Sequence, residues 1–361
     1  MKKMKMAACL LAAVAFGSVC LVGCGGGESS QSEENTLSVS VYMPDGAPAM
    51  AFAKLMQEDT AEDGVSYTVV NPSTIASRLT NKDEDKNADV CVLPVTAASK
   101  LVGDGTRYQM LGVVTNGNLC ILSKDEQLKN SFELNEYYDI SYLVGKTVGV
   151  MKINDLPGLT FKAVLDGYNL PWQELKNDGE VAADKINLKA IADATAIDPM
   201  ASDVACYVVA EPAASVQVKK NGFTNVCALD VLYNTVSTSV STVDFSGYPQ
   251  AVMVAKKSLI NEEKEWIDGF IQKVKQSVSD LNGGKMTGEE VVAAVTAHQE
   301  DPYYKTTLNA TVLTADVITR CAVRFTDNNG ARVAVYTYLA KLQNVEASAA
   351  KTVADGFFYE P

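Results

Sequence analysis

The chain has 361 residues, of which 47% are hydrophobic and 21% are charged. This length and composition are typical of a globular protein of about two domains, and they exclude a fibrous or wholly disordered chain. The formal net charge is −13. Because an acidic chain repels a phosphate backbone, we expect no nucleic-acid partner.

The first 24 residues have the pattern of a secretory signal peptide. Lys2, Lys3 and Lys5 give a positively charged start, and the apolar stretch that follows ends in Leu-Val-Gly-Cys at Cys24. An apolar stretch of about 17 residues is at the lower limit for crossing a bilayer, so a membrane anchor is the alternative interpretation. A charged start, a short apolar core and small residues at the end favour cleavage. We therefore predict a leader over residues 1–23.

A lipid anchor is implied by the end of this leader. The Leu-x-Gly-Cys pattern resembles a bacterial lipobox, which implies that Cys24 becomes the lipidated first residue of an exported protein. Residues 24–35 are rich in Gly, Ser and Glu and predict a flexible tether. The resemblance implies attachment to the outer face of the cytoplasmic membrane, or the periplasmic side in a Gram-negative cell.

Strand and helix patterns alternate from residue 36 onward. In chain order, the first part predicts strands at 37–43, 65–70, 90–93, 108–114 and 119–122, with helices at 48–58, 73–79 and 96–102. The middle part predicts strands at 147–151, 186–190, 204–209 and 225–229, with helices at 158–166 and 212–220. A strand at 251–255 is followed by helices at 258–281, 287–298, 314–324 and 330–342. This order predicts an α/β protein with mainly parallel sheets and helices on both faces.

The middle part interrupts the first, so the chain crosses twice between two α/β units. Two segments are candidates for the crossings, 118–123 and 250–256. We predict one lobe from residues 36–119 plus 251–361 and a second lobe from residues 120–250. Such a two-lobe layout leaves a ligand cleft between the lobes and suits closure about a hinge.

Short polar and small residues follow most of the predicted strands. Ligands of open α/β sheets bind beyond the carboxyl ends of the strands, where backbone N–H groups at helix starts are free. Ordinary turn and capping chemistry explains any one of these loops. Together, the loops predict a binding site, and they are 45–48, 71–74, 94–97, 115–118, 154–158 and 210–212.

Five segments of the chain resemble ABC-transporter substrate-binding proteins, most closely the alkanesulfonate, nitrate, taurine and thiamine-precursor binders. They are MPDGAPAMAFAKLM, ADVCVLPVTAASKL, GVVTNGNLCILS, LVGKTVGVMKINDLPGLTFKAVL and VACYVVAEPAASV. The resemblance implies a two-lobe type II periplasmic-binding-protein fold. It also implies a monomer that captures a small solute by lobe closure and delivers it to a membrane permease with a separate ATPase.

The resemblance also implies which residues contact the ligand. In the first lobe they are Asp45, Gly46, Ala47, Pro48, Asn71, Pro94, Val95, Thr96, Thr115 and Asn118. In the second lobe they are Asn154, Pro157, Gly158, Leu159 and Glu211. The chain departs from the family in having Met43 and Asn118-Leu119 where relatives often have a large aromatic residue, which argues against a stacked, flat ligand.

The charged residues in these loops predict a neutral or partly cationic ligand. None of the five arginines lies in one of the predicted ligand loops, so an arginine clamp on an anion is not expected. Asp45 and Glu211 favour an amino or amidine group, although turn and helix-start roles are the alternatives. We expect no cofactor and no metal, because no cysteine or histidine has metal-ligand spacing.

Two other functions fit an α/β two-lobe chain: an enzyme that acts on a small organic acid, and the ligand-binding module of a sensor. The sequence offers little for catalysis, since His298 is the single histidine and no common catalytic motif is present. Four cysteines lie in apolar, strand-like runs and are predicted to be buried thiols; they are Cys91, Cys120, Cys206 and Cys227.

Overall fold

The computed structural model describes residues 37–58, 64–133, 139–176, 179–237 and 245–361. Leu37–Pro361 forms one compact unit. The predicted leader, the tether and Cys24 lie outside the described residues. Within the described part of the chain, no helix combines the length and the apolar character needed to cross a bilayer.

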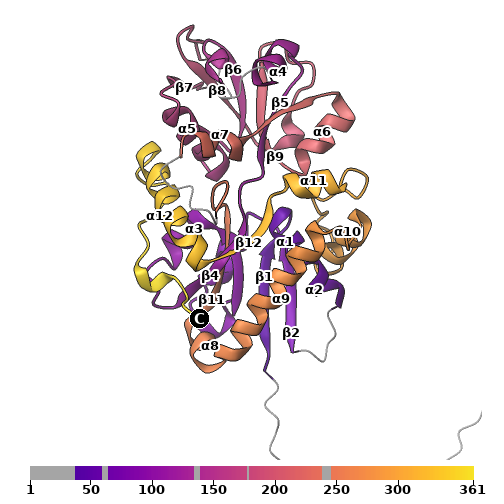
Figure 1. The fold of residues 1–361 in the computed structure, drawn as a ribbon, viewed down its shortest axis with the longest axis vertical. Coiled ribbons are helices and arrows are strands. Elements are labelled where there is room, and N and C mark those ends of the chain that lie inside the picture. The colour runs from indigo at the N-terminus through magenta and orange to yellow at the C-terminus, as the bar shows by residue number, and fades with distance from the viewer. Residues whose placement is uncertain (1–36, 59–63, 134–138, 177–178, 238–244) are drawn as a thin grey trace, which may run out of the picture. The chain divides into compact units, whose positions relative to one another are not determined.

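Two six-stranded sheets form the framework (Figure 1). The first sheet has the order β12-β4-β11-β3-β1-β2 and the second has the order β10-β5-β9-β6-β8-β7. The strands of the first sheet are β1 (Val39–Pro44), β2 (Val65–Val70), β3 (Val90–Pro94), β4 (Tyr108–Thr115), β11 (Ala251–Lys256) and β12 (Val323–Asp327). Those of the second are β5 (Leu119–Ser123), β6 (Thr147–Met151), β7 (Trp172–Glu174), β8 (Ile186–Ile191), β9 (Cys206–Ala210) and β10 (Thr224–Ala228).

Both sheets are mixed, so the prediction of mainly parallel sheets is wrong for the first sheet. There β1 is parallel to β2 and β3, but β11 runs antiparallel to β3 and β4, and β12 antiparallel to β4. In the second sheet β6 is parallel to β8 and β9, whereas β5 is antiparallel to β9 and β10. One cause is that β5 enters the second sheet directly from β4 of the first sheet, without the crossover helix that a parallel neighbour requires.

Helices cover both faces of the first sheet (Figure 1). Their apolar residues form one core with the strands on one face and a second core on the other. One face carries α1 (Ala47–Met50), α2 (Ala53–Glu58), α9 (Lys264–Asn282) and α10 (Gly288–Ala297), and the other carries α3 (Val95–Leu101) and α12 (Asn328–Val345). Two further helices adjoin this sheet, α8 (Lys257–Glu262) and α11 (Ala315–Arg320).

The second sheet is covered in the same way. Two helices, α5 (Leu156–Gly167) and α7 (Leu229–Thr235), pack on one face, and α6 (Ala213–Asn221) packs on the other. Helix α4 (Glu126–Glu133) packs against β5 and β10. The described short 3₁₀ turns are η1 (Ile75–Leu79), η2 (Glu84–Lys86), η3 (Ser141–Leu143), η4 (Ala194–Ala196) and η5 (Asp355–Phe357).

Several predicted elements differ in the structure. The helix predicted over 48–58 is divided into α1 and α2, and the helix predicted over 73–79 is the 3₁₀ turn η1. The helix predicted over 258–281 is interrupted at Glu263, whose φ of −129° and ψ of 47° separate α8 from α9. The helix predicted over 314–324 ends at Arg320, because Val323 and Phe325 instead form the edge strand β12 beside β4. The strand predicted over 225–229 ends at Ala228, and α7 begins directly after it.

Elements of the two sheets share one apolar core where α12 packs against α5. Tyr233, Tyr248 and Tyr338 are buried there, with ring centroids 5.4–5.6 Å apart. The hydroxyl of Tyr338 hydrogen-bonds the hydroxyl of Thr160 on α5. We call these four residues the aromatic junction.

Five cysteines in the described residues are free and buried, and they include the four predicted thiols. Burial raises the pKa of Cys206 and of Cys227 to about 12. The prediction of buried thiols is therefore confirmed for Cys91, Cys120, Cys206 and Cys227, and Cys321 joins them.

Candidate functional site

Three of the predicted loops lead into helices that have no side-chain cap. Helix α1 follows Gly46, whose φ of 101° favours glycine, and α3 follows Pro94. In the second sheet, α5 follows Asp155. Pro48 and Pro157 occupy the first turns of α1 and α5, where a missing N–H costs nothing. These helix starts leave backbone N–H groups without a side-chain acceptor.

The predicted ligand residues differ widely in exposure. Nine are buried, namely Asp45, Gly46, Ala47, Val95, Thr115, Asn118, Gly158, Leu159 and Glu211. Four are half-buried, namely Pro48, Pro94, Thr96 and Pro157, and two are exposed, namely Asn71 and Asn154. The structure brings Asn118 and Glu211 into direct contact, since the Asn118 Nδ2 donates to the Glu211 carbonyl at 2.6 Å.

The carboxylate of Asp45 is fully used inside the protein. It accepts hydrogen bonds from the Thr306 hydroxyl at 2.6 Å and from the Thr307 N–H and hydroxyl, each at 2.7 Å. The sequence analysis missed this segment, because Thr306 lies 261 residues from Asp45 and no local pattern marks the pairing. Asp45 therefore fixes the loop after β1 to the segment that follows α10.

The carboxylate of Glu211 is also fully used. It accepts from the Ser215 N–H at 3.0 Å, from the Ser215 hydroxyl at 2.9 Å and from the Arg320 Nε at 2.8 Å. Arg320 is the last residue of α11, so one arginine does reach a predicted loop, although it lies in none of them. Because Asp45 and Glu211 both have protein donors, they no longer give a reason to expect a cationic ligand.

A hydrogen-bond network joins the two segments that cross between the sheets. Gln250 Nε2 donates to Asn118 Oδ1 at 2.8 Å, and the Asn118 N–H donates to Gln250 Oε1 at 2.9 Å. The Tyr248 ring lies against Gly117, where an added Cβ would come within 2.5 Å of the ring, and the φ of Gly117 is 96°. The crossing is thus closely packed and fixed in register.

A buried lysine supports the loop between β6 and α5. The Lys162 side chain is 2% exposed, and its Nζ donates to the Ile153 carbonyl at 3.0 Å and pairs with Glu174. Gly158 lies so close that an added Cβ would be 2.1 Å from the same carbonyl. This loop is held tightly against the first turn of α5, and it presents the exposed Asn154.

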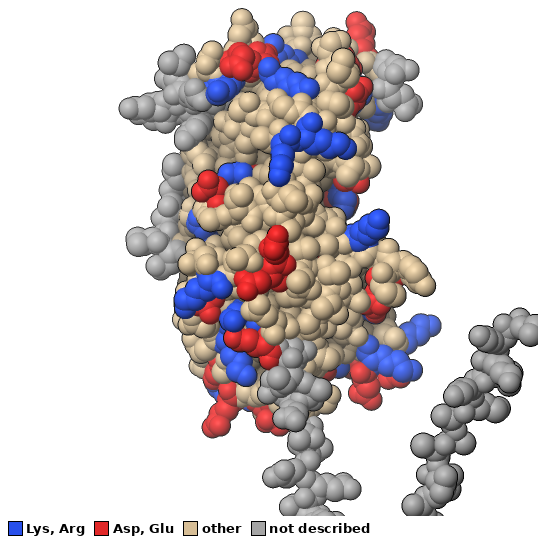
Figure 2. Space-filling model, turned by 90° about the vertical axis from the view of Figure 1, so that its right-hand side faces the viewer, with Lys and Arg blue, Asp and Glu red and all other residues tan. Residues whose placement is uncertain are grey.

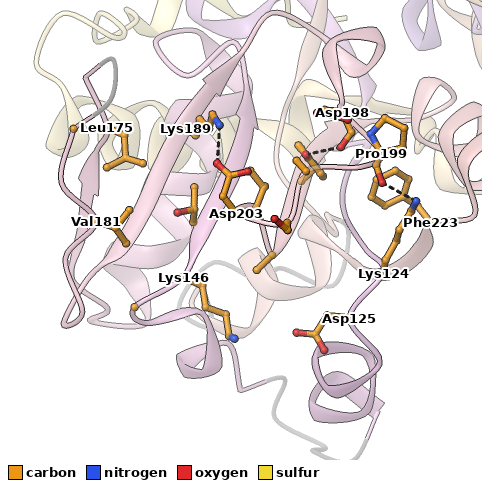
Figure 3. Close-up of a pocket in the computed structure, with 18 residues that line it drawn as sticks. Lys124, Asp125, Lys146, Leu175, Val181, Lys189, Asp198, Pro199, Asp203 and Phe223 are labelled. Atoms are coloured by element: carbon orange, nitrogen blue, oxygen red, sulfur yellow. Dashed lines mark hydrogen bonds and ion pairs between the residues drawn. The ribbon is translucent and has the colours of Figure 1, made fainter.

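A cavity of about 670 Å³ lies elsewhere, on the second sheet (Figure 3). It lies beside the end of β5 and the starts of β6 and β9, at the opposite end of these strands from the predicted loops, and it contains none of the predicted residues. Lys189 pairs there with Asp203 at 2.9 Å, and Lys124 donates to the Pro199 carbonyl at 3.0 Å. Its lining contains three lysines and three aspartates, so it favours neither charge.

The charged side chains on one face of the molecule mark no further site. On the face drawn in Figure 2, basic and acidic side chains are intermixed and form no single basic patch. Among the residues that the structure describes, no group of three His, Cys, Asp or Glu side chains is arranged to hold a metal.

Comparisons with known proteins identify the fold. No protein-family model matches the sequence, and no curated protein matches it. Among solved structures, an ABC transporter protein from Parabacteroides distasonis is 18% identical, with a TM-score of 0.64 over 90% of this chain and 99% of that chain. The periplasmic aliphatic sulphonate binding protein of Escherichia coli is 14% identical, with a TM-score of 0.58 over 90% and 92%.

A third structure agrees with these two. The alkanesulfonate-binding protein of Xanthomonas axonopodis pv. citri, bound to MOPS, is 10% identical, with a TM-score of 0.50 over 88% of this chain and 95% of that chain. The chain therefore has the type II periplasmic-binding-protein fold, as predicted from the sequence. The boundaries of the two lobes, at residues 119/120 and 250/251, stay a prediction.

Proposed function

We propose that the protein is an extracytoplasmic solute-binding protein, which captures a small organic molecule and delivers it to an ABC importer. The similarity in fold to binding proteins of this kind over about nine tenths of the chain is the observation that carries the proposal. The sequence adds a leader that ends in a lipobox-like Cys24, which fits a lipid-anchored monomer at the cell surface. An ABC permease with its ATPase would be the partner.

The ligand site that we propose is formed by the strand-end loops. The start of α5 is its best-defined part, because the loop before it is braced by Lys162 and the helix has no side-chain cap. A helix start favours a ligand group that accepts hydrogen bonds, and it favours an anion most. Since Asp45 and Glu211 already have protein donors, alkanesulfonates, which two of the similar proteins bind, become the first ligands to test.

Transport requires the ligand to shift the protein between an open and a closed arrangement. A ligand changes this equilibrium only if it binds one arrangement better than the other. Loops from both sheets must therefore contact it, and the predicted residues come from both. We propose that the lobes close on the ligand in this way.

A thermal-shift screen of the chain that begins at residue 25 tests the proposal. The panel holds alkanesulfonates, nitrate, aminopyrimidines, flavins, amino acids and polyamines. A ligand at 100 times its Kd stabilises the folded state by about 2.7 kcal/mol, which for a chain of this size raises the Tm by several degrees. We expect a saturable increase from one class.

Two variants locate the binding site. Asn154→Ala should weaken binding of the best panel member at least tenfold, whereas Lys189→Ala, in the cavity on the second sheet, should leave it unchanged. Isothermal titration measures both. If Lys189→Ala weakens binding and Asn154→Ala does not, the ligand site lies in that cavity. If no panel member binds saturably but one is turned over, the protein is an enzyme and the transport proposal is wrong.

A further inference from the structure

The elements of the two sheets also meet through polar groups. Arg320 ends α11, three residues before β12 of the first sheet, and Glu211 follows β9 of the second sheet. The Arg320 Nε lies 2.8 Å from the Glu211 Oε1, and the Arg320 Nη2 donates to the Ser215 hydroxyl at 3.0 Å. The Lys219 Nζ donates to the Thr311 carbonyl at 2.8 Å. We call these five residues the polar junction.

The ion pair at this junction is unevenly buried. The Glu211 side chain is 1% exposed, whereas that of Arg320 is 39% exposed. If the two sheets moved apart here, the carboxylate would lose the arginine that pairs with it, and only water that reached it could replace that partner. A buried, unpaired charge is strongly unfavourable.

Two of the neighbours of Glu211 are cysteine thiols. Burial raises the pKa of the Cys120 and Cys321 thiols, and the negative charge of Glu211 raises both further. These neutral thiols cannot compensate a carboxylate. Ser215 donates two further hydrogen bonds to the Glu211 carboxylate. It lies on the same side of the junction as Glu211 and would move with it.

The geometry also explains why an arginine is present. Its planar fork reaches two acceptors at once, the Glu211 carboxylate and the Ser215 hydroxyl. A lysine, with one compact charge on a flexible chain, cannot hold both in the same fixed orientation. The contact therefore fixes the direction of the loop between β9 and α6 as well as its distance from α11.

We infer that Arg320 is a positioning residue that clamps the loop between β9 and α6 to the first sheet and stabilises the arrangement of the two sheets seen in this structure over arrangements in which they lie further apart. The inference rests on the proposed function, because this loop belongs to the proposed ligand site. It adds that part of the free energy of closure comes from the protein itself. Opening then requires the clamp to break.

Distance measurements on the ligand-free protein test this inference. The chain beginning at residue 25 carries spin labels at Lys220→Cys on α6 and Glu289→Cys on α10, two exposed positions attached to different sheets. The five described cysteines are buried and should remain unlabelled. We expect one main distance in the parent, and in Arg320→Gln at least a fivefold larger population at longer distances.

Matched variants separate positioning from simple stability. Arg332→Gln removes the ion pair between Arg332 on α12 and Glu360, whose atoms are 2.7 Å apart. This variant should have the same distances between the two spin labels as the parent. Arg320→Lys should have a population at longer label distances between those of the parent and Arg320→Gln. If Arg320→Gln does not fold, Arg320→Lys takes its place in the test. Glu211→Gln should match Arg320→Gln.

The inference is wrong if the Arg320 variants keep the parent distance distribution, even when their Tm falls. That result would leave Arg320 a purely structural residue. Because the measurement needs no ligand, it is independent of the thermal-shift screen. A positive screen with unchanged distances retains the transport proposal and removes the clamp. A negative screen with turnover of a panel member, together with altered distances, retains the clamp as a contact between the sheets and removes the transport proposal.

Discussion

The aromatic junction and the polar junction connect the same two sheets by different physical means. At the first, three tyrosine rings pack within an apolar core, and Tyr248 and Tyr338 are completely buried. At the second, an ion pair and a few hydrogen bonds join α11 and the segment before it to α6 and the end of β9. One contact depends on buried area and the other on exact placement of donors and acceptors.

This difference indicates how the two junctions respond to movement. Burial of apolar area is non-directional, so rings can slide by small amounts at little cost. Hydrogen bonds weaken steeply when distance or angle changes. We therefore expect the aromatic junction to stay in contact as a pivot, and the polar junction to form or break as a unit.

The largest change in the free energy of unfolding is expected when a side chain of the aromatic junction is truncated. Tyr338→Ala should lower the free energy of unfolding by about 3–5 kcal/mol, because it removes a completely buried ring. Urea denaturation measures the change. Tyr338→Phe is the control, since it removes only the hydrogen bond to Thr160 and should cost about 1 kcal/mol. Equal losses in the two variants would mean that the hydroxyl, and not the ring, holds the junction together.

A smaller change in stability is expected when Tyr233 of the aromatic junction is replaced and the protein is compared at alkaline pH. Burial raises the pKa of Tyr233 to about 12, whereas an unfolded tyrosine has a pKa near 10. Between these values the folded state retains a proton that the unfolded state releases, so stability falls as pH rises. Tyr233→Phe should reduce the loss of unfolding free energy between pH 10 and pH 11 by roughly 1 kcal/mol.

The control for the alkaline measurement is Tyr303→Phe, at a tyrosine that is 91% exposed. Urea denaturation at pH 9, 10 and 11 gives the slope for each protein. If both substitutions flatten the slope equally, the burial of Tyr233 does not distinguish the aromatic junction from the surface.

The smallest effect is expected from the outer contact of the polar junction. Lys219→Met removes the hydrogen bond to the Thr311 carbonyl, but the lysine is exposed and its partner in this contact is a neutral carbonyl oxygen. We expect a change in unfolding free energy below about 0.5 kcal/mol and an unchanged distance between the labels on α6 and α10. If Lys219→Met changed the label distances as much as Arg320→Gln does, Lys219 and not Arg320 would hold the two sheets together.

The sequence predicted most of the framework because its signals are local. The predicted strands at 65–70 and 147–151 match β2 and β6, since alternating or continuous β-branched residues mark each of them. The elements that were missed have weak local patterns. Strand β7 has only three residues, which is too short for a clear pattern. The edge strand β12 pairs with β4, which lies in a distant part of the chain.

The candidate site was predictable only at the level of loops. Strand ends and helix starts are local features, and the structure places Asn154 and Gly158 at one such start. The partners of the two acidic residues were not predictable, because Arg320 is 109 residues from Glu211 and Thr307 is 262 residues from Asp45. Long-range pairing of this kind decides whether a carboxylate is available to a ligand, and no pattern in one sequence encodes it.

The buried thiols have a consequence for how the chain matures. The five described cysteines are free, and their burial disfavours the thiolate that oxidants attack. This part of the chain reaches its final form without any oxidation step. It should therefore fold equally well before and after exposure to oxidants, and its yield should not depend on thiol-oxidising enzymes in the compartment where it matures.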